Sequence, residues 1–329
     1  MKAARLYAPG DIREDWMADP EPDADEELIR VSAVGLCGSD RHWFAEGGIG
    51  DAVLARPRVL GHEIAGVIES GPRQGVRVAV DPAVPCGRCD LCARDLGHLC
   101  RALRFAGHGT TDGGLRTLMA WPARLLAPIP DSIAGDEAAL LEPLGVALHA
   151  LDLGKIRVGM SVGVFGCGPI GLLTIRVLQQ LGVSQILTTD PLPGRRAAAL
   201  AAGASDARES ANDSDWPELD VVIEVAGADG AVRDAVVAVR PGGRIVLVGI
   251  PSSDQTSFPA STARRKGLTI LLSRRMRASD LRRAIALAAT GDLELRSLIT
   301  ARYPLDRVDE AFDALNRYEG LKVLIEPRA

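Results

Sequence analysis

A glycine-rich segment between an apolar strand and a helix restricts the possible folds of this chain most strongly. Gly166, Gly168 and Gly171 fit the spacing G-x-G-x-x-G. Residues 162–165 before them predict a buried strand, and residues 170–181 after them predict an apolar helix. Glycines at such a turn let backbone N–H groups approach a pyrophosphate at the helix N-terminus. The segment therefore predicts a dinucleotide site, and the alternative is a glycine-rich turn that binds nothing.

Strands and helices alternate after this segment. Further strands are expected at 186–189, 219–225, 243–248 and 268–271. Helices are expected between the earlier of them, at 195–202 and 231–239. Alternation of this kind predicts a parallel sheet built from right-handed crossovers. The first ~140 residues instead predict short strands bounded by Gly, Pro and Asp, such as 28–34, 64–69 and 76–80.

Asp190 ends the strand that follows the glycine-rich segment, nineteen residues after Gly171. A carboxylate there can accept hydrogen bonds from both ribose hydroxyls and would repel a 2′-phosphate, which favours NAD over NADP. Arg195 and Arg196 lie close by in the sequence. Further cofactor contacts are expected from Pro169, Ile170, Arg195, Val248 and Gly249. Cys167 inside the loop is expected to be a packing residue rather than a reactive thiol.

Four of the six cysteines fall within fifteen positions. Cys86, Cys89, Cys92 and Cys100 can surround one tetrahedral ion, and Zn²⁺ with four thiolates has no open position. We therefore expect a structural zinc site. Free buried cysteines and a redox dithiol are the alternatives. A zinc-finger nucleic-acid module is disfavoured because no basic helix or stripe accompanies the tetrad.

A second set of metal-binding residue types is spread along the chain. Cys37 is the only cysteine outside the tetrad and the glycine-rich loop, and His62 and Glu63 lie together between expected strands. Glu142 stands in an apolar segment where a carboxylate needs a partner. Thiolate, imidazole and carboxylate would neutralise Zn²⁺ and leave a position open for water or substrate. Taken singly, such a histidine is more often a packing or surface residue.

Composition limits the partners and the location. The net charge is −5 and the pI is about 5.6, so no cationic field is present to hold nucleic acid or an anionic membrane. The longest apolar stretches are too short to span a bilayer, and the N-terminus has no apolar signal-peptide core. The length of 329 residues favours about two domains. We therefore expect a soluble, cytoplasmic, two-domain protein.

Together these motifs resemble the zinc-dependent medium-chain dehydrogenases over nearly the whole chain, and most of all their polyol branch of sorbitol, xylitol and L-idonate dehydrogenases. The resemblance is carried by Cys37-Gly-Ser-Asp40, His42, Gly61-His-Glu63, the cysteine tetrad, Arg104-Phe105 and Glu142. It implies an α/β fold in which a GroES-like β-rich catalytic domain is interrupted by a Rossmann doubly wound parallel-sheet domain. The implied boundaries are 1–143 with 281–329 for the first domain and 144–280 for the second.

The resemblance also implies roles for individual residues. Cys37, His62 and Glu63 would hold a catalytic zinc, and Glu142 would approach the metal directly or through water, where the simple alcohol dehydrogenases have a cysteine. Ser39 would relay the substrate proton. His42 would carry that proton onward or would simply be a buried hydrogen-bonding residue. Substrate contacts are expected from Trp43, Phe105 and Arg274 (or Arg275), with core packing or a solvated face as the alternatives.

The expected activity follows from that resemblance. It is zinc-dependent transfer of a hydride from a secondary hydroxyl of a polyol or sugar-derived substrate to NAD, with two zinc ions per chain. An L-idonate-type sugar-acid dehydrogenase and a threonine or glucose dehydrogenase are the alternatives within the family, and a non-catalytic NAD-binding sensor is the alternative outside it. A homodimer or homotetramer joined near the 268–271 strand is expected.

Overall fold

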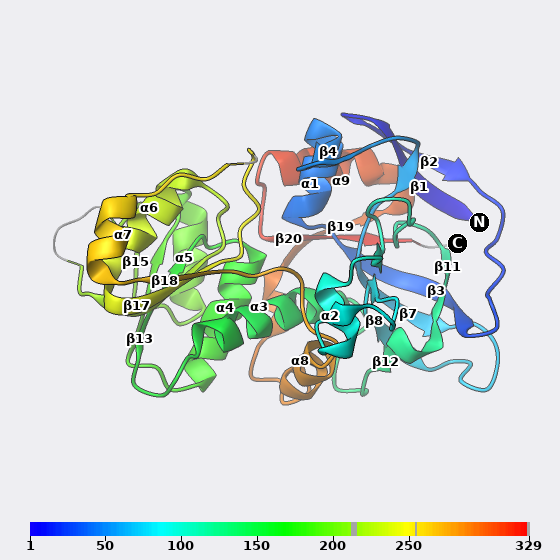
Figure 1. Cartoon of the computed structure of the whole chain (residues 1–329). Coiled ribbons are helices and arrows are strands. Elements are labelled where there is room, and N and C mark those ends of the chain that lie inside the picture. Colours follow the sequence, from blue (N-terminus) through cyan, green and yellow to red (C-terminus); the bar gives the residue numbers. More distant parts are fainter. Residues whose placement is uncertain (212–215, 254, 328–329) are drawn as a thin grey trace. The chain divides into compact units, whose positions relative to one another are not determined.

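The computed structural model describes residues 1–211, 216–253 and 255–327 (Figure 1). The chain forms two compact units, the first from Met1–Glu142 together with Arg277–Ala329 and the second from Pro143–Met276. The domain boundaries expected from the sequence, 143/144 and 280/281, lie close to these. Among the described residues, no helix has both the length and the apolar character needed to cross a membrane.

A seven-stranded sheet is the centre of the first unit. Its strands lie in the order β12-β8-β7-β3-β20-β19, and β11 also pairs with β3. All of these pairs are antiparallel except β19 with β20. The bounds are β3 (Glu26–Gly35), β7 (Glu63–Ile68), β8 (Arg77–Val80), β11 (Leu118–Pro122), β12 (Leu126–Pro128), β19 (Ile299–Pro304) and β20 (Lys322–Glu326).

β3 shows why this sheet forms from the sequence. Its apolar residues Ile29, Val31 and Ala33 are buried, whereas Arg30 and Ser32 between them are exposed, which is the period of two of a strand with one covered face. The late strand β20 pairs with β3 through Leu324 and Ile325, so the end of the described chain lies beside its early part (Figure 1). The first unit is therefore complete only with both of its segments.

Smaller elements surround this sheet. Helix α1 packs against α9 (Figure 1). The rings of Phe44 and Phe312, one from each helix, have centroids 4.9 Å apart. The remaining strands of the unit are β1 (Lys2–Ala8), β2 (Asp11–Trp16), β4 (Gly48–Ile49), β5 (Ala52–Val53), β6 (Arg58–Val59), β9 (Ala83–Val84) and β10 (Arg104–Phe105). Its α-helices are α1 (Gly38–Glu46), α2 (Asp90–Ala93), α8 (Asp280–Ala288) and α9 (Val308–Asn316). Its 3₁₀ helices are η1 (Gly97–Leu99), η2 (Ala123–Leu125), η3 (Glu137–Leu140), η4 (Leu295–Leu298) and η5 (Leu305–Arg307).

The second unit contains a six-stranded sheet in which every pair is parallel, in the order β15-β14-β13-β16-β17-β18. Successive strands extend in one direction from β13 and in the other from β16, so the order reverses between these two neighbours. The strands are β13 (Ser161–Phe165), β14 (Gln185–Thr189), β15 (Asp206–Arg208), β16 (Leu219–Glu224), β17 (Val239–Leu247) and β18 (Thr269–Leu272). The helices are α3 (Leu141–Gly154), α4 (Pro169–Gln180), α5 (Pro193–Ala201), α6 (Asp229–Ala238) and α7 (Ala260–Lys266). The predicted doubly wound parallel sheet is confirmed.

The glycine-rich turn between β13 and α4 is closely packed. Gly166 has φ of 104°, a conformation that glycine adopts without strain. At Gly171 a Cβ atom would overlap the carbonyl oxygen of Gly166. The helix can therefore approach the end of β13 only because position 171 carries no side chain.

Gly171→Ala tests this close approach. We expect the free energy of unfolding to fall by roughly 1–3 kcal/mol, because the added methyl group must displace backbone. Gly194→Ala is the matched control, since Gly194 is an exposed helix residue with no atom within 4 Å of the added methyl, and alanine there should keep or raise stability. Equal unfolding midpoints for the two variants in urea would contradict the packing argument.

Candidate active site

The structure brings Cys37, His62 and Glu63 together in the first unit. One ligand atom from each residue, a sulfur, a ring nitrogen and a carboxylate oxygen, lies within 4.8 Å of the other two. Cys37 is the N-cap of α1, and Glu63 begins β7 opposite Gly35 of β3. The three residues expected from the sequence are therefore neighbours, and their donor atoms are ones that Zn²⁺ accepts.

Asp40 fixes the two segments that carry these side chains. It is 1% exposed, and its carboxylate accepts hydrogen bonds from the backbone N–H groups of Cys37 (2.9 Å) and Gly61 (3.2 Å). The same carboxylate lies 3.6 Å from His62 Nδ1. Burial opposes protonation of His62, but Asp40 and Cys37 hold its pKa well above the usual value. Asp40 therefore stabilises positive charge at the imidazole. A bound metal ion could supply that charge in place of a proton.

A buried lysine holds Glu63. Lys322 Nζ donates to both carboxylate oxygens, at 2.8 and 2.6 Å, and to the carbonyl oxygen of Leu36 at 3.0 Å. Both charged side chains are 1% exposed. Burial lowers the pKa of Lys322, but the negative charges of Glu63, Cys37 and Glu142 and the hydrogen bond to Glu63 together outweigh burial, and the pKa is raised. Gly35 makes room for the pair, because a Cβ there would overlap the Glu63 carboxylate.

Lys322 was missed by the sequence reasoning. The signal that could have found it is a lysine at the start of an apolar strand, since a buried ammonium needs an anionic partner. Nothing in the local sequence says which carboxylate that partner is, because Glu63 lies 259 positions away.

Glu142 lies near the cluster of Cys37, His62 and Glu63, but it is not one of the residues whose ligand atoms lie within 4.8 Å of one another. It is 6% exposed, and burial raises its pKa to about 7. The positive charges of His62 and Lys322 lower the pKa of Glu142, and the negative charge of Glu63 raises it. The structure therefore places a carboxyl group that can exchange a proton near neutral pH within the electrostatic reach of this cluster.

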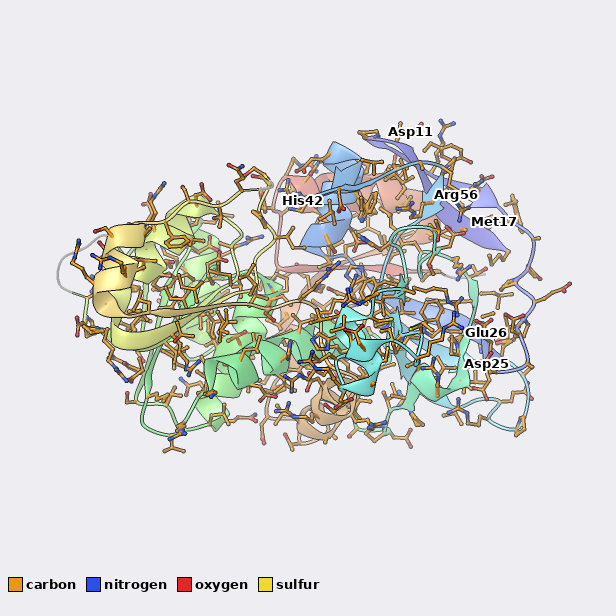
Figure 2. All side chains as sticks on the ribbon, in the orientation of Figure 1. Asp11, Met17, Asp25, Glu26, His42 and Arg56 are labelled. Atoms are coloured by element: carbon orange, nitrogen blue, oxygen red, sulfur yellow. The ribbon has the colours of Figure 1, made fainter. Side chains whose placement is uncertain are left out.

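The predicted relay and substrate residues occupy different surroundings. The hydroxyl oxygen of Ser39 lies 3.4 Å from His62 Nε2. His42 is a residue of α1 (Figure 2). Its Nδ1 lies 2.9 Å from a Glu46 carboxylate oxygen. The ring of Phe105 has its centroid 5.5 Å from that of His62, so Phe105 borders the cluster.

Trp43 and Arg274, the other two predicted substrate residues, are described each within its own unit. Trp43 is 2% exposed and belongs to the hydrophobic core, with Arg58 4.6 Å from its ring centroid and the His108 ring at 5.4 Å. Arg274 is an exposed residue of the second unit, after β18, and Arg275 beside it has φ of 61°. Substrate contact by Trp43 and Arg274 stays a prediction.

The cysteine tetrad forms a second cluster of ligand atoms. The sulfur atoms of Cys86, Cys89, Cys92 and Cys100 all lie within 4.8 Å of one another, and none is in a disulfide. Backbone N–H groups, foremost that of Cys92, lower the pKa of Cys89 to about 6, which favours the thiolate that a metal binds. The helix in this loop, α2, has no buried residue. A metal ion would therefore supply order that apolar packing in this helix does not.

In the second unit, Asp190 is joined to the glycine-rich loop. One carboxylate oxygen accepts from Cys167 N and the other from Leu192 N, both at 2.9 Å. Each oxygen keeps a further lone pair for a ribose hydroxyl. Arg196 donates to the carbonyl oxygen of Asp190 at 2.7 Å. Cys167 is fully buried and burial raises its pKa to about 11, as expected for a packing residue.

The other predicted cofactor residues lie at the same edge of the sheet. Gly168 is the N-cap of α4, followed by Pro169 and Ile170 in the first turn of that helix. Val248 and Gly249 follow β17, and their N–H groups both donate to the carbonyl oxygen of Glu224 at the end of β16. The carboxyl ends of β13, β14 and β17 therefore carry the glycine-rich loop, Asp190, Val248 and Gly249, at the edge where parallel sheets bind dinucleotides. Arg195 lies in helix α5.

Comparison with known proteins agrees with this geometry. Residues 23–131 match the alcohol dehydrogenase GroES-like domain, and residues 169–290 match the zinc-binding dehydrogenase family. Sorbitol dehydrogenase of Bacillus subtilis is 33% identical over 99% of this chain and 97% of its own length. A probable D-xylulose reductase A of Aspergillus clavatus is 34% identical, over 92% of this chain and 90% of its own.

Solved structures show the same fold. The crystal structure of L-idonate 5-dehydrogenase from Escherichia coli has a TM-score of 0.90 and 26% sequence identity, and the match covers 99% of this chain and 98% of that one. The predicted combination of a GroES-like domain with a Rossmann-type sheet is confirmed. The chain is therefore an oxidoreductase that belongs to the zinc-dependent medium-chain dehydrogenase family, in its polyol branch.

Proposed function

We propose that this enzyme transfers a hydride from a secondary hydroxyl group of a polyol to NAD, with zinc held by Cys37, His62 and Glu63. The observation that carries the proposal is the convergence of these three side chains within 4.8 Å. The relatives named as sorbitol dehydrogenase and D-xylulose reductase support a polyol as substrate. The first unit would act as the catalytic domain and the second as the NAD-binding domain.

The residues around the cluster fit a zinc ion. One thiolate and one carboxylate balance the charge of Zn²⁺, and three protein ligands leave a fourth position open. Asp40 behind His62 and Lys322 behind Glu63 are the outer partners that orient metal ligands and tune their basicity. Because the charges of Asp40 and Lys322 cancel, these outer partners add no net charge to the site.

The bound zinc and nicotinamide would supply part of the chemistry at this centre, and side chains of the protein would supply the rest. Zinc would act as a Lewis acid that lowers the pKa of the substrate hydroxyl, and nicotinamide would accept the hydride. Ser39 lies beside His62 and would receive the hydroxyl proton. His42 would pass this proton toward Glu46 on the exposed side of α1. Glu142 would reach the zinc directly or through water. Phe105 would form an apolar wall of the pocket.

A sugar acid is the second candidate substrate. Residues 273–277 carry Arg274, Arg275 and Arg277, more positive charge than a neutral polyol requires. The structural relative named as L-idonate 5-dehydrogenase has the same fold over nearly its whole length. A threonine or glucose dehydrogenase is not favoured by any observation on this structure.

The second unit supports a homo-oligomer. β18 is the last strand in the order of the six-stranded sheet, and its residue Leu272 is 80% exposed. An edge strand with unpaired backbone groups can pair with the same strand of a second copy. We therefore retain the expectation of a homodimer or homotetramer joined through β18. The cytoplasmic location stays a prediction.

Cys37→Ser tests the assignment of the catalytic zinc. We expect turnover of sorbitol with NAD to be lost and the zinc content to fall from two ions per chain to one, because the hydroxyl is a poor substitute for a thiolate ligand. Cys167→Ser is the control and should keep both ions. Retained activity with two ions in Cys37→Ser would refute the ligand assignment.

Cys89→Ser tests the structural zinc. Loss of this zinc removes binding energy that contributes to folding, so the unfolding temperature should fall. It should also respond less to a chelator than that of the wild type, because only the catalytic ion remains. Thermal unfolding with and without EDTA measures both effects. An unchanged midpoint would mean that the tetrad does not stabilise the fold through a metal.

Asp190→Asn tests the choice of NAD. An amide keeps one oxygen as the acceptor for one of the two backbone N–H groups and removes the charge that repels a 2′-phosphate. We expect the ratio of kcat/KM for NADP to that for NAD to rise by roughly tenfold, equivalent to ~1.4 kcal/mol. The comparison uses both cofactors at a saturating sorbitol concentration. If the ratio does not change, Asp190 does not select the cofactor.

A further inference from the structure

Glu224 is a buried carboxyl group to which the proposed chemistry assigns no role. It is the last residue of β16, which pairs with β13, the strand that leads into the glycine-rich loop. Only 1% of its surface is exposed. The order of the sheet reverses between these two strands, and parallel sheets bind ligands outside the carboxyl ends of strands at such a reversal. Glu224 therefore lies beneath the expected cofactor crevice.

Hydrogen bonds of Glu224 join two segments of this edge. Its side-chain Oε1 accepts from Ala226 N at 2.8 Å and from Gly227 N at 2.7 Å. Its backbone carbonyl accepts from Val248 N at 2.8 Å and Gly249 N at 3.2 Å. One residue thus holds both the turn after β16 and the chain that leaves β17.

These segments touch one another through their backbones. A Cβ on Gly166 would lie 2.8 Å from Ala226 N, so the turn after β16 packs directly on the glycine-rich loop. A Cβ on Gly227 would overlap the carbonyl oxygen of Ile250, and one on Gly249 would overlap Gly227 N. No side chain separates the three segments, so a shift in the turn after β16 moves its neighbours.

The charge of Glu224 is compensated by backbone amides alone. Within the described chain, no lysine or arginine forms an ion pair with it. Burial raises its pKa above the usual value, although the N–H groups of Gly227, Ala226, Ala228 and Gly249 act to lower it. An anion surrounded by backbone N–H groups is a stable arrangement, whereas a neutral acceptor in its place would hold those groups with weaker hydrogen bonds. The turn therefore depends on a carboxylate at this position.

We propose that Glu224 is the positioning residue for the nicotinamide half of the dinucleotide. Asp190 at the end of β14 is expected at the adenosine ribose, and the glycine-rich loop after β13 at the pyrophosphate. Continuing across the sheet, the remaining half of the molecule lies over the ends of β16 and β17, which Glu224 holds together. This inference rests on the proposed use of NAD.

Glu224→Gln tests the proposal by binding of two probes, NADH and AMP. We expect the Kd for NADH to rise about tenfold or more, because the neutral amide oxygen holds the N–H groups of Ala226 and Gly227 less strongly than the carboxylate does and the turn shifts. The Kd for AMP, which reaches only the adenosine side, should stay unchanged. Titration calorimetry measures both affinities on the zinc-loaded protein.

Asp220→Asn is the matched control. Asp220 lies near the opposite end of β16, where its carboxylate accepts from Ser161 N at 2.8 Å. The Asp220→Asn substitution removes one negative charge from the same strand, away from the crevice. The affinities for NADH and for AMP should therefore both stay unchanged. A selective loss of NADH binding in Glu224→Gln alone supports the proposal.

Two results would overturn it. One is an unchanged NADH affinity in Glu224→Gln, and the other is an equal loss of NADH and AMP affinity, which indicates a general disturbance of the unit. If Glu224→Gln does not fold, Glu224→Asp is measured in the same way. Its shorter carboxylate cannot reach both amides, and the same criteria apply. Wild-type protein that binds no NADH would contradict the proposed cofactor itself, whereas wild-type binding with an unchanged variant contradicts only the role of Glu224.

Discussion

The ion pair between Lys322 and Glu63 is the interaction on which the first unit and its candidate metal centre both depend. Removing two charges from water costs several kcal/mol per ion, and only close pairing with further hydrogen bonds repays that cost. Here the ammonium meets both carboxylate oxygens and a backbone carbonyl. The pair holds the carboxylate of Glu63, a proposed zinc ligand, in place. It also links β20 to β7, which lie on either side of β3. The same ion pair therefore stabilises the sheet of the first unit and orients a residue of the candidate metal centre.

Close backbone packing has the same double role in the second unit. The glycine-rich loop, the turn after β16 and the chain after β17 meet where glycines leave no side chain between them. Two buried carboxylates, Asp190 and Glu224, hold these segments by accepting hydrogen bonds from their backbone N–H groups. The edge expected to bind the cofactor is thus set by the backbone before any cofactor contact forms.

Much of this arrangement could be predicted from the sequence, because short-range patterns carried the information. The strand, glycine-rich turn and helix around Gly166 predicted a parallel sheet, and the spacing of Cys86, Cys89, Cys92 and Cys100 predicted a cluster that the structure shows. The role of Lys322 could not be predicted, because its partner is distant in the chain and set by the pairing of β20 with β3. For Trp43 the sequence left a pocket wall and core packing open; the structure shows it buried beside Arg58 and His108, and its contact with substrate stays a prediction.

The position of β20 in the central sheet has a consequence for the order of folding during synthesis. The ribosome makes residues 143–276 before it makes 322–326, so the parallel sheet of the second unit can form while the first unit still lacks a strand. Until Lys322 emerges, Glu63 lacks the ammonium group that pairs with it in the folded unit. A nascent chain can therefore hold its dinucleotide fold early, but its candidate metal centre matures only after residues 322–326 have been made.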